Sequence, residues 1–328
     1  MSCKATVLLS TLLYCCFCLP QGEASSIAVG SGVSQHGINK FRGKVAVVTG
    51  GASGIGYAIA SKCIREGMNL LLSDINEPAL RAAAGKLSQT YQCEVEYLAT
   101  DVRSEQGMSE LLNRCMEKFR GVNMFFNNAG VIGEPSKGVL DTPLSSWRWV
   151  LDTNVLGLII GAKVFIEAME KQGGDCHVIN TASGAGLYSQ HRPTMGPYVA
   201  SKHCAVVLTQ AMKTELEARK SNVQMHLLCP SIVATDLVPN SRYIASHHDR
   251  VANGEEAAST ELDAVSQAFH QRLNADGMSP DTVAELTFQG VQAHRFFILT
   301  HPNITLKRID ARHQELVSSI SEQPTTGF

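Results

Sequence analysis

The sequence lacks the excess of positive charge that suits nucleic acid. Its 28 Lys and Arg residues are slightly outnumbered by 30 Asp and Glu residues, which gives a formal net charge of -2. Proteins that bind a phosphate backbone usually carry a clustered basic surface. The composition therefore argues against nucleic acid as a partner.

The body of the chain also lacks the paired cysteines of a zinc site. Four of the ten cysteines fall in the first twenty residues, and none of the other six belongs to a C-x-x-C pair. Structural zinc needs clustered thiolates or imidazoles, so we predict no metal. Each of the six stands alone in an apolar segment, which favours buried thiols over a disulfide framework. They are Cys63, Cys93, Cys115, Cys176, Cys204 and Cys229.

An uncharged apolar run at the N-terminus, residues 5–19, is too short for a membrane span, which needs about 20 residues. It follows Lys4 and precedes the small residues Gly22 and Ala24. This pattern predicts a secretory signal over residues 1–24, cleaved after Ala24, and hence a protein of the ER lumen or a secreted one. The alternative is an uncleaved anchor in the ER membrane, and only then would the chain contact a membrane. Residues 25–40 are polar and glycine-rich, which predicts a linker.

Short apolar runs alternate with helix-length segments through the body, residues 41–302. Most runs are continuously apolar, which is typical of parallel strands covered on both faces. This alternation predicts a single α/β domain with a doubly wound parallel sheet of about seven strands and helices on both faces. A C-terminal tail is expected over residues 303–328. The predicted strands are 44–50, 69–74, 95–100, 123–128, 177–182, 223–229 and 295–300, and the helices include 54–66, 77–90, 104–119, 145–172 and 197–220.

The first predicted strand ends in TGGASGIG, residues 49–56, and a helix follows at once. Glycines at 50, 54 and 56 let the backbone turn tightly near a pyrophosphate, and the helix N-terminus supplies N–H donors. Asp74 ends the second strand, where a carboxylate accepts hydrogen bonds from ribose hydroxyls and repels a 2′-phosphate. No Arg or Lys in the loop or just after Asp74 would offset that repulsion, so we predict NAD rather than NADP. The alternative is that Asp74 caps the next helix.

Tyr198 and Lys202 lie four residues apart on a predicted helix and therefore on the same side of it. A phenol has a pKa near 10, and a neighbouring ammonium lowers that pKa toward the range of a useful base. Ser183 stands upstream in a glycine-flanked turn, where its hydroxyl would stabilise charge on a substrate oxygen. The spacing indicates a proton-transfer site.

Together these motifs occur in the order of the classical short-chain dehydrogenases/reductases (SDR). The chain resembles that family closely over residues 40–236 and more loosely over 280–302, through TGGASGIG, DV at 101–102, NNAG, NTAS and YVASK. The resemblance implies a Rossmann-type fold, a homodimer or homotetramer, and hydride exchange between a nicotinamide and an alcohol or carbonyl. It implies Tyr198 as acid/base with Lys202 beside it, Ser183 at the substrate oxygen, and Asn154 holding a water in a proton relay. The implied cofactor-binding residues are Gly50, Ser53, Gly54, Ile55, Gly56, Asp74, Asp101, Val102, Asn128, Ala129, Gly130, Tyr198, Lys202, Pro230 and Thr235.

The chain departs from the family pattern at Pro230-Ser231, where Pro-Gly is usual, and in a slightly longer gap between Ser183 and Tyr198. In this family, specificity resides in the loop after the sixth strand, here residues 231–280. Tyr188, Met195 and Leu237 are expected to line the near side of the pocket, and a helix with Val265, Phe269 and Leu273 to cover it.

These features predict an NAD(H)-dependent oxidoreductase that interconverts a hydrophobic secondary alcohol and its ketone or aldehyde through tyrosine acid/base catalysis. Three alternatives stay open: an NADPH-dependent carbonyl reductase, an inactive dinucleotide-binding sensor or scaffold, and a nucleotide-sugar epimerase. The epimerases usually need a larger C-terminal domain than the residues that follow the sixth strand here.

Overall fold

The computed structural model describes residues 40–188, 194–242 and 261–321. The chain divides into two compact units, residues 1–37 and 38–328, and every described residue belongs to the second. The expected signal or anchor and nearly all of the expected linker therefore lie outside the described residues. Everything below concerns the second unit.

The second unit alternates strands and helices along most of its length. The strands are β1 (Val45–Thr49), β2 (Asn69–Asp74), β3 (Glu96–Ala99), β4 (Met124–Asn127), β5 (Cys176–Thr181), β6 (Val223–Cys229) and β7 (Phe297–Leu299). The helices are α1 (Gly54–Arg65), α2 (Glu77–Tyr91), α3 (Glu105–Phe119), α4 (Leu144–Leu151), α5 (Gly157–Gln172), α6 (Gly196–Ala218), α8 (Ala264–Asp276), α9 (Pro280–Gln292) and α10 (Pro302–Ser321). A π-helical turn, η1 (Asp152–Leu156), joins α4 to α5, and a 3-10 turn, η2 (Gly184–Gly186), follows β5.

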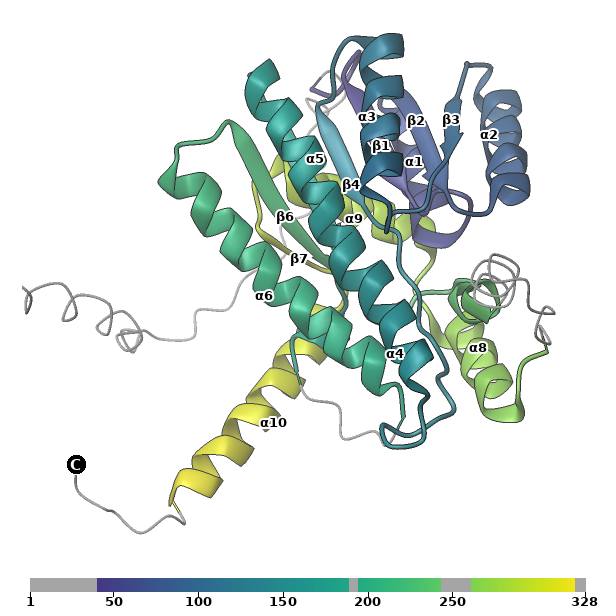
Figure 1. Ribbon diagram of the computed structural model, residues 1–328. Helices are drawn as coiled ribbons and strands as arrows, with labels where there is room; N and C mark the ends of the chain where they lie inside the picture. The colour runs from purple at the N-terminus through teal and green to yellow at the C-terminus, as the bar shows by residue number, and fades with distance from the viewer. Residues whose placement is uncertain (1–39, 189–193, 243–260, 322–328) are drawn as a thin grey trace, which may run out of the picture. The chain divides into compact units, whose positions relative to one another are not determined.

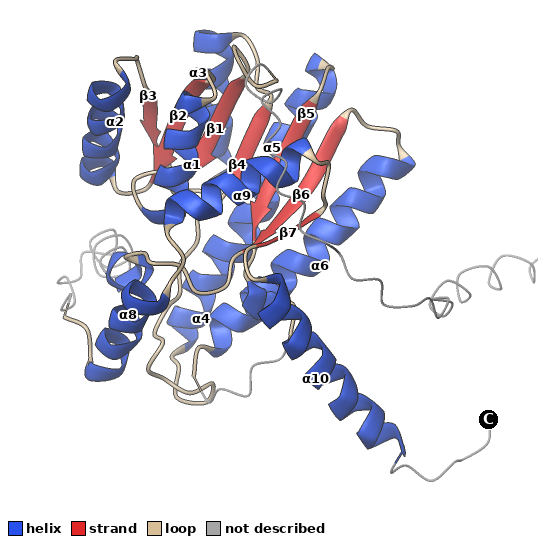
Figure 2. Ribbon diagram, turned by 180° about the vertical axis from the view of Figure 1, so that it is seen from behind, coloured by secondary structure: helices blue, strands red, loops and turns tan. Residues whose placement is uncertain are grey.

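All seven strands form one parallel sheet in the order β3-β2-β1-β4-β5-β6-β7. Figure 1 shows α3, α5 and α6 in front of this sheet, and Figure 2, seen from behind, shows α1 and α9 across its other face. The predicted doubly wound fold is thus confirmed. The strand order reverses between β1 and β4, and the carboxyl ends on either side of this switch point form the usual ligand-binding edge of such a sheet.

Neighbouring residues of β4 serve the two faces of the sheet. Side chains alternate along a strand, so Phe125 and Phe126 point in opposite directions. Phe125 stacks on Phe165 of α5 with ring centres 3.9 Å apart, whereas Phe126 packs with Phe288 of α9 at 5.8 Å. All four rings are fully buried. Burying such a side chain contributes roughly 1.5–3 kcal/mol, so this layer fixes the strand ends that carry the site.

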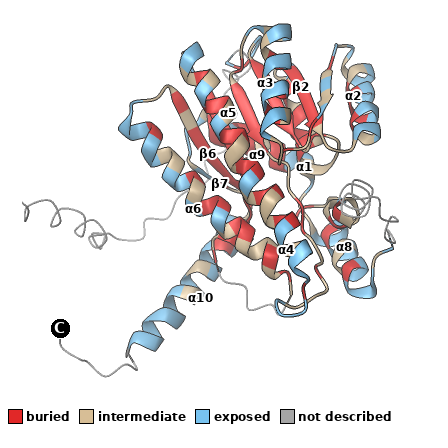
Figure 3. Cartoon of the chain, in the orientation of Figure 1, coloured by how far each residue is buried: buried red, intermediate tan, exposed pale blue. Residues whose placement is uncertain are grey.

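Two expectations about helices need correction. The single helix expected over 145–172 contains the π-helical turn η1, which interrupts its regular hydrogen bonding. The expected tail over residues 303–328 contains α10, which Figure 3 shows as largely exposed. Most of α10 packs against no other part of the described chain, so its sequence lacks the regular spacing of core residues by which a helix is recognised.

Four of the six body cysteines are buried, as expected, but Cys93 is only partly buried and Cys204 is exposed. All six are free thiols. Within the described ranges, one helical stretch, Leu144–Gln172, is long and apolar enough to span a membrane, and half of its most apolar window is buried in this domain. It is the α4–η1–α5 stretch, which packs against the sheet. No group of residues suited to a metal ion occurs among the described residues.

Candidate active site

The glycine loop after β1 forms a tight backbone turn at the ligand-binding edge. Gly50 has φ +65°, and a Cβ there would lie 2.9 Å from the Cα of Ala129. A Cβ on Gly56 would collide with the carbonyl oxygen of Gly50. Only glycine therefore permits this turn, which leads directly into the N-terminus of α1. The exposed N–H groups and the helix dipole suit a pyrophosphate, so the residues present fit a dinucleotide.

Asp74 ends β2 beside this loop. One carboxylate oxygen accepts the N–H of Ala52 at 3.2 Å, and the other accepts the N–H of Asn76 at 3.0 Å. The cap of α2 is Asn76, whose side chain accepts the N–H of Ala79. The alternative in which Asp74 caps that helix is therefore wrong, and its carboxylate lies at the cavity wall.

Asp101 and Val102 line a smaller cavity of about 70 Å³ beside the main one. Gly50, Asp74, Ala129 and Gly130 line both cavities, so the two adjoin. Arg103 also lines this smaller cavity, and no motif in the sequence predicts it there. Its guanidinium pairs with Asp101, with Nη2 2.8 Å from Oδ2. The positive charge of Arg103 is thus already paired with the carboxylate of Asp101.

Asn128 ties three strand ends together. Its Nδ2 donates to the carbonyl oxygen of Thr49 at 3.1 Å, and its Oδ1 accepts the hydroxyl of Thr181 at 3.1 Å. The N–H of Asn128 also donates to the Thr49 hydroxyl. These bonds span β1, β4 and β5, so the NNAG turn has a defined structural task and lines the main cavity as well.

Tyr198 and Lys202 lie in the first turns of α6, where both line the main cavity. The Lys202 ammonium is 5.7 Å from the centre of the Tyr198 ring and donates to the carbonyl oxygen of Thr181 at 3.0 Å. Ser183 caps the turn η2, and its hydroxyl donates to the carbonyl oxygen of Pro230 at 3.4 Å. Three of the four predicted catalytic side chains therefore converge on one cavity, whereas Asn154 is not among the residues that line it.

Burial dominates the electrostatics of the pair. It raises the pKa of the Tyr198 phenol, and a hydrogen bond with Ser183 works against this rise. Burial lowers the pKa of Lys202 to about 8. The expected lowering of the Tyr198 pKa by the ammonium is therefore not found in the chain without cofactor, where desolvation is the largest influence on both groups.

Asn154 lies in the π-helical turn η1, a type of distortion that is frequent at functional sites. Its side-chain oxygen accepts the N–H of Val131 at 2.8 Å, and its Nδ2 donates to the Val131 carbonyl oxygen at 2.8 Å and to Ser201 at 2.9 Å. A Cβ on Gly130 would lie 3.2 Å from Oδ1 of Asn154 and 3.3 Å from Nζ of Lys202. Asn154 is therefore held beside the lysine, while its expected role toward a water stays a prediction.

The main cavity has a volume of about 330 Å³. Tyr188, Met195 and Leu237 line it, as predicted, and so do Phe269 and Leu273 of α8. Val265 is 56% exposed, so the prediction that it covers the pocket is wrong; it lies on the outer face of α8. The predicted cofactor residues on this wall are Gly50, Ser53, Gly54, Ile55, Gly56, Asp74, Asn128, Ala129, Gly130, Tyr198, Lys202, Pro230 and Thr235.

The departure at Pro230-Ser231 is accommodated by the chain segment that follows β7. The N–H of Ser231 donates to the hydroxyl of Thr300 at 3.0 Å. Sequence reasoning also missed Arg308 of α10, which lines the cavity from a segment expected to be a tail. A single arginine on an exposed helix carries no motif, so only the tertiary structure locates it.

A glycine loop at the switch point of a parallel sheet, with tyrosine and lysine beside it, defines a nicotinamide-dependent class of enzyme. Comparison with known proteins agrees. The sequence model of the short chain dehydrogenase family matches residues 44–243. The chain therefore belongs to this family of oxidoreductases, which bind a nicotinamide dinucleotide.

Individual relatives support the assignment. The CLA biosynthesis dehydrogenase/reductase of Lactiplantibacillus plantarum is 31% identical over 268 residues, which are 80% of this chain and 89% of that protein. The NADP-dependent (R)-specific alcohol dehydrogenase of Lentilactobacillus kefiri is 30% identical over 204 residues, 61% of this chain and 77% of that protein. The solved structure of a short chain dehydrogenase/reductase from Burkholderia phymatum in complex with NAD has a TM-score of 0.76 and 35% identity, and covers 88% of this chain and 98% of that chain.

Proposed function

We propose that the chain is an NAD(H)-dependent oxidoreductase that interconverts a hydrophobic secondary alcohol and its ketone, with Tyr198 as the acid/base. The observation that carries the proposal is the convergence of Tyr198, Lys202 and Ser183 on one cavity that also contains the glycine loop. The apolar wall of Met195, Leu237, Phe269 and Leu273 supports a hydrophobic substrate.

In this proposal each side chain has one task. A bound nicotinamide supplies the position that accepts or donates the hydride. The Tyr198 phenolate takes the proton of the alcohol during oxidation, and the phenol that results gives a proton back to the substrate oxygen during reduction. Lys202 stabilises the phenolate charge that develops, and a low-dielectric site strengthens this attraction. The Ser183 hydroxyl donates to the substrate oxygen and holds it within reach of Tyr198. Asn154 fixes the turn beside Lys202 and holds a water of the proton relay.

The preference for NAD rests on Asp74. A carboxylate at the end of β2 would accept hydrogen bonds from a ribose and repel a 2′-phosphate. Arg103, which lies nearby, is paired with Asp101 and so is poorly placed to offset that repulsion. The relatives named above include both NAD and NADP in their descriptions, so the cofactor choice is part of the proposal.

A homo-oligomer and a secretory location complete the proposal. Apolar side chains are exposed on the η1 and α6 surface, with Leu156 50% and Val207 64% exposed, and a second copy of the chain would cover them. Analytical ultracentrifugation that finds only monomers at micromolar concentration would exclude this assembly. We further propose that residues 1–24 direct the chain to the secretory pathway.

The experiment that tests the reaction follows NADH formation from NAD with a panel of hydrophobic secondary alcohols. Tyr198→Phe should lower kcat about 10²- to 10⁴-fold, because it removes the acid/base group, while fluorescence titration still detects NADH binding. Tyr91→Phe is the matched control, since the Tyr91 hydroxyl bonds to Ser61 at 2.7 Å and does not line the cavity. Activity of Tyr198→Phe near that of the control would overturn the mechanism.

A further inference from the structure

Arg308 of the C-terminal helix lines the main cavity, although the residue as a whole is exposed. The start of α10 is docked, because Thr305 is 2% exposed, and Arg308 follows one turn later. Nη1 of Arg308 donates a hydrogen bond to the Tyr188 hydroxyl at 2.5 Å. The guanidinium carbon lies 5.0 Å from the centre of the Tyr188 ring. Tyr188 is itself 2% exposed, so a buried side chain holds the guanidinium at the cavity wall.

Arg308 lies at the catalytic end of the cavity rather than at the end that Asp74 occupies. A Cβ on Gly184 would be 3.4 Å from the Tyr188 hydroxyl, and Gly184 directly follows Ser183. Tyr188 is also close enough to Tyr198 to affect its pKa electrostatically, in the upward direction. One phenol therefore links the guanidinium to the group expected to handle the proton.

The charges around the cavity leave Arg308 without an acidic partner among the described residues. Arg272 pairs with Asp276 at 3.5 Å, and Asp236 faces His270 at 3.6 Å. Arg308 has only its contact with Tyr188 in the described part of the chain. A guanidinium offers five N–H donors in a planar fork, and one bond to a phenol leaves most of them available.

We propose that the physiological substrate is a hydroxy acid or oxo acid with an apolar chain, whose carboxylate binds Arg308 while its carbinol or carbonyl carbon lies at Tyr198 and Ser183. The proposal deepens the proposed function and rests on it. A carboxylate matches the planar fork in a bidentate way. The apolar remainder of such a substrate suits the wall of Met195, Leu237, Phe269 and Leu273.

The test uses the full-length chain and straight-chain hydroxy acids with the hydroxyl at successive positions, each paired with its own methyl ester. The wild-type protein should prefer the acid of the best pair by about 10-fold in kcat/KM, because a hydrogen bond to a charged group contributes on that order and a partly exposed pair lies at the low end. Arg308→Met should abolish this preference, mainly through a higher KM for the acid. Arg308→Lys, which keeps the charge but loses the fork, should retain part of it.

Lys307→Met is the matched control, since it removes one positive charge from the same turn of α10 but does not line the cavity. It should keep the acid preference. An acid-to-ester ratio that is the same in the wild type and in Arg308→Met would overturn the inference and leave Arg308 as a support for Tyr188.

Binding separates this inference from the proposed reaction. A fluorescent long-chain carboxylic acid should bind the wild type and Tyr198→Phe alike, and about 10-fold more weakly to Arg308→Met, whether or not any alcohol is oxidised. Such a result without turnover supports the carboxylate site and counts against the proposed reaction. Equal binding to the wild type and Arg308→Met would sink the inference even if ester substrates are turned over.

Discussion

The protein should lose stability in mild acid because of two buried histidines, His177 near the start of β5 and His226 in the middle of β6. His177 and His226 are 0% and 1% exposed, and His177 Nδ1 lies 3.0 Å from His226 Nε2. His226 Nδ1 also bonds to the Arg295 carbonyl oxygen at 2.7 Å. Burial lowers the pKa of each histidine to about 4.

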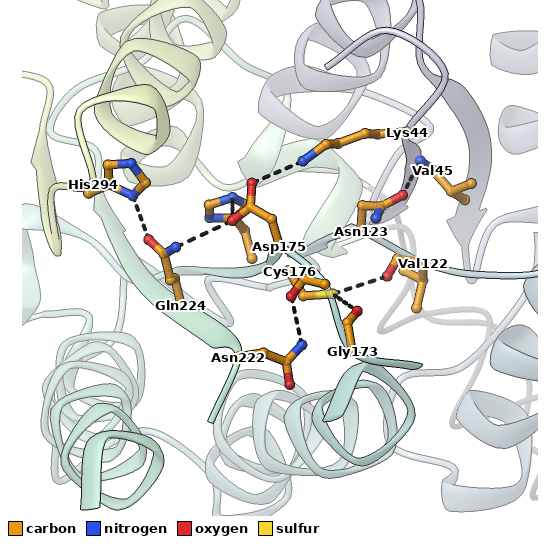
Figure 4. A network of polar contacts seen from close by, with 12 residues as sticks. Lys44, Val45, Val122, Asn123, Gly173, Asp175, Cys176, Asn222, Gln224 and His294 are labelled. Atoms are coloured by element: carbon orange, nitrogen blue, oxygen red, sulfur yellow. Dashed lines mark hydrogen bonds and ion pairs between the residues drawn. The ribbon is translucent and has the colours of Figure 1, made fainter. Parts of the chain in front are cut away.

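The groups around the pair favour the charged form only weakly. Asp175 Oδ1 lies 3.2 Å from Nε2 of His177, but that carboxylate also pairs with Lys44 at 2.9 Å. Figure 4 shows Asp175 between Lys44 and Gln224, with His294 bonded to Gln224. Desolvation is therefore the largest influence on both histidines, and both are neutral in the folded protein near neutral pH.

The sign and size of the effect follow from linkage. An unfolded histidine has a pKa near 6.5. Between pH 6.5 and about pH 4 the histidines are therefore protonated in the unfolded state but still neutral in the folded state, which favours unfolding. Stability is full above pH 6.5 and falls toward pH 4. Between pH 7 and pH 5 each histidine costs about 2 kcal/mol. Because the two titrate as a coupled pair, about 4 kcal/mol is the upper bound. At about 2–4 °C per kcal/mol, Tm should drop by roughly 10 °C.

Thermal and urea unfolding at pH 7, 6 and 5 would measure how the free energy of unfolding changes with pH. Carboxylates whose pKa is lowered in the folded protein stay ionised over this pH range. The double variant His177→Asn/His226→Gln places amide groups near the facing ring nitrogens but cannot titrate, so its stability should vary much less with pH. His313→Asn, at an exposed position on α10, is the control and should keep the wild-type slope. A wild-type loss of less than about 1 kcal/mol between pH 7 and pH 5 would refute this prediction, and so would a double variant that keeps the wild-type slope.

Two further predictions concern the cofactor and the N-terminus. Asp74→Ala should raise the KM for NAD about 10-fold and narrow its advantage over NADP, since it removes the carboxylate beside the loop; an unchanged NAD-to-NADP ratio in steady-state kinetics would refute the ribose role. In the protein made in eukaryotic cells, N-terminal sequencing should find Ser25 as the first residue. A sequence that begins at Met1 or Ser2 would instead support the uncleaved anchor.

The sequence predicts the sheet well because its signals are local. Continuous apolar runs mark buried parallel strands, and all seven predicted runs overlap the observed strands. The site motifs are predictable for the same reason: Gly56 is required by a turn within the motif, and Tyr198 and Lys202 lie one helical turn apart. A short stretch of sequence thus contains most of the geometry of each.

The features that the sequence does not reveal depend on contacts between distant segments. Arg308 reaches Tyr188 across 120 residues, and the exposed face of α10 gives no periodic signal. The sequence also gives no signal for the π-helical turn around Asn154, because its residues suit an ordinary α-helix. The pKa of Tyr198 is a third case. Helical spacing places the Lys202 ammonium near the Tyr198 phenol. The spacing cannot predict how strongly the surrounding domain desolvates the two groups.

The acid-sensitive network and the catalytic residues share their strands, so the two kinds of pH dependence have to be separated. β5 begins beside His177 and ends at Thr181, whose carbonyl oxygen binds Lys202, and four residues of strand span only about 13 Å. Protonation of the His177–His226 pair therefore destabilises the strand that holds the lysine. A fall in activity below pH 6.5 that disappears in the His177→Asn/His226→Gln variant comes from stability. A fall that persists in this variant comes from the titration of catalytic groups, and only that part bears on Tyr198 and Lys202.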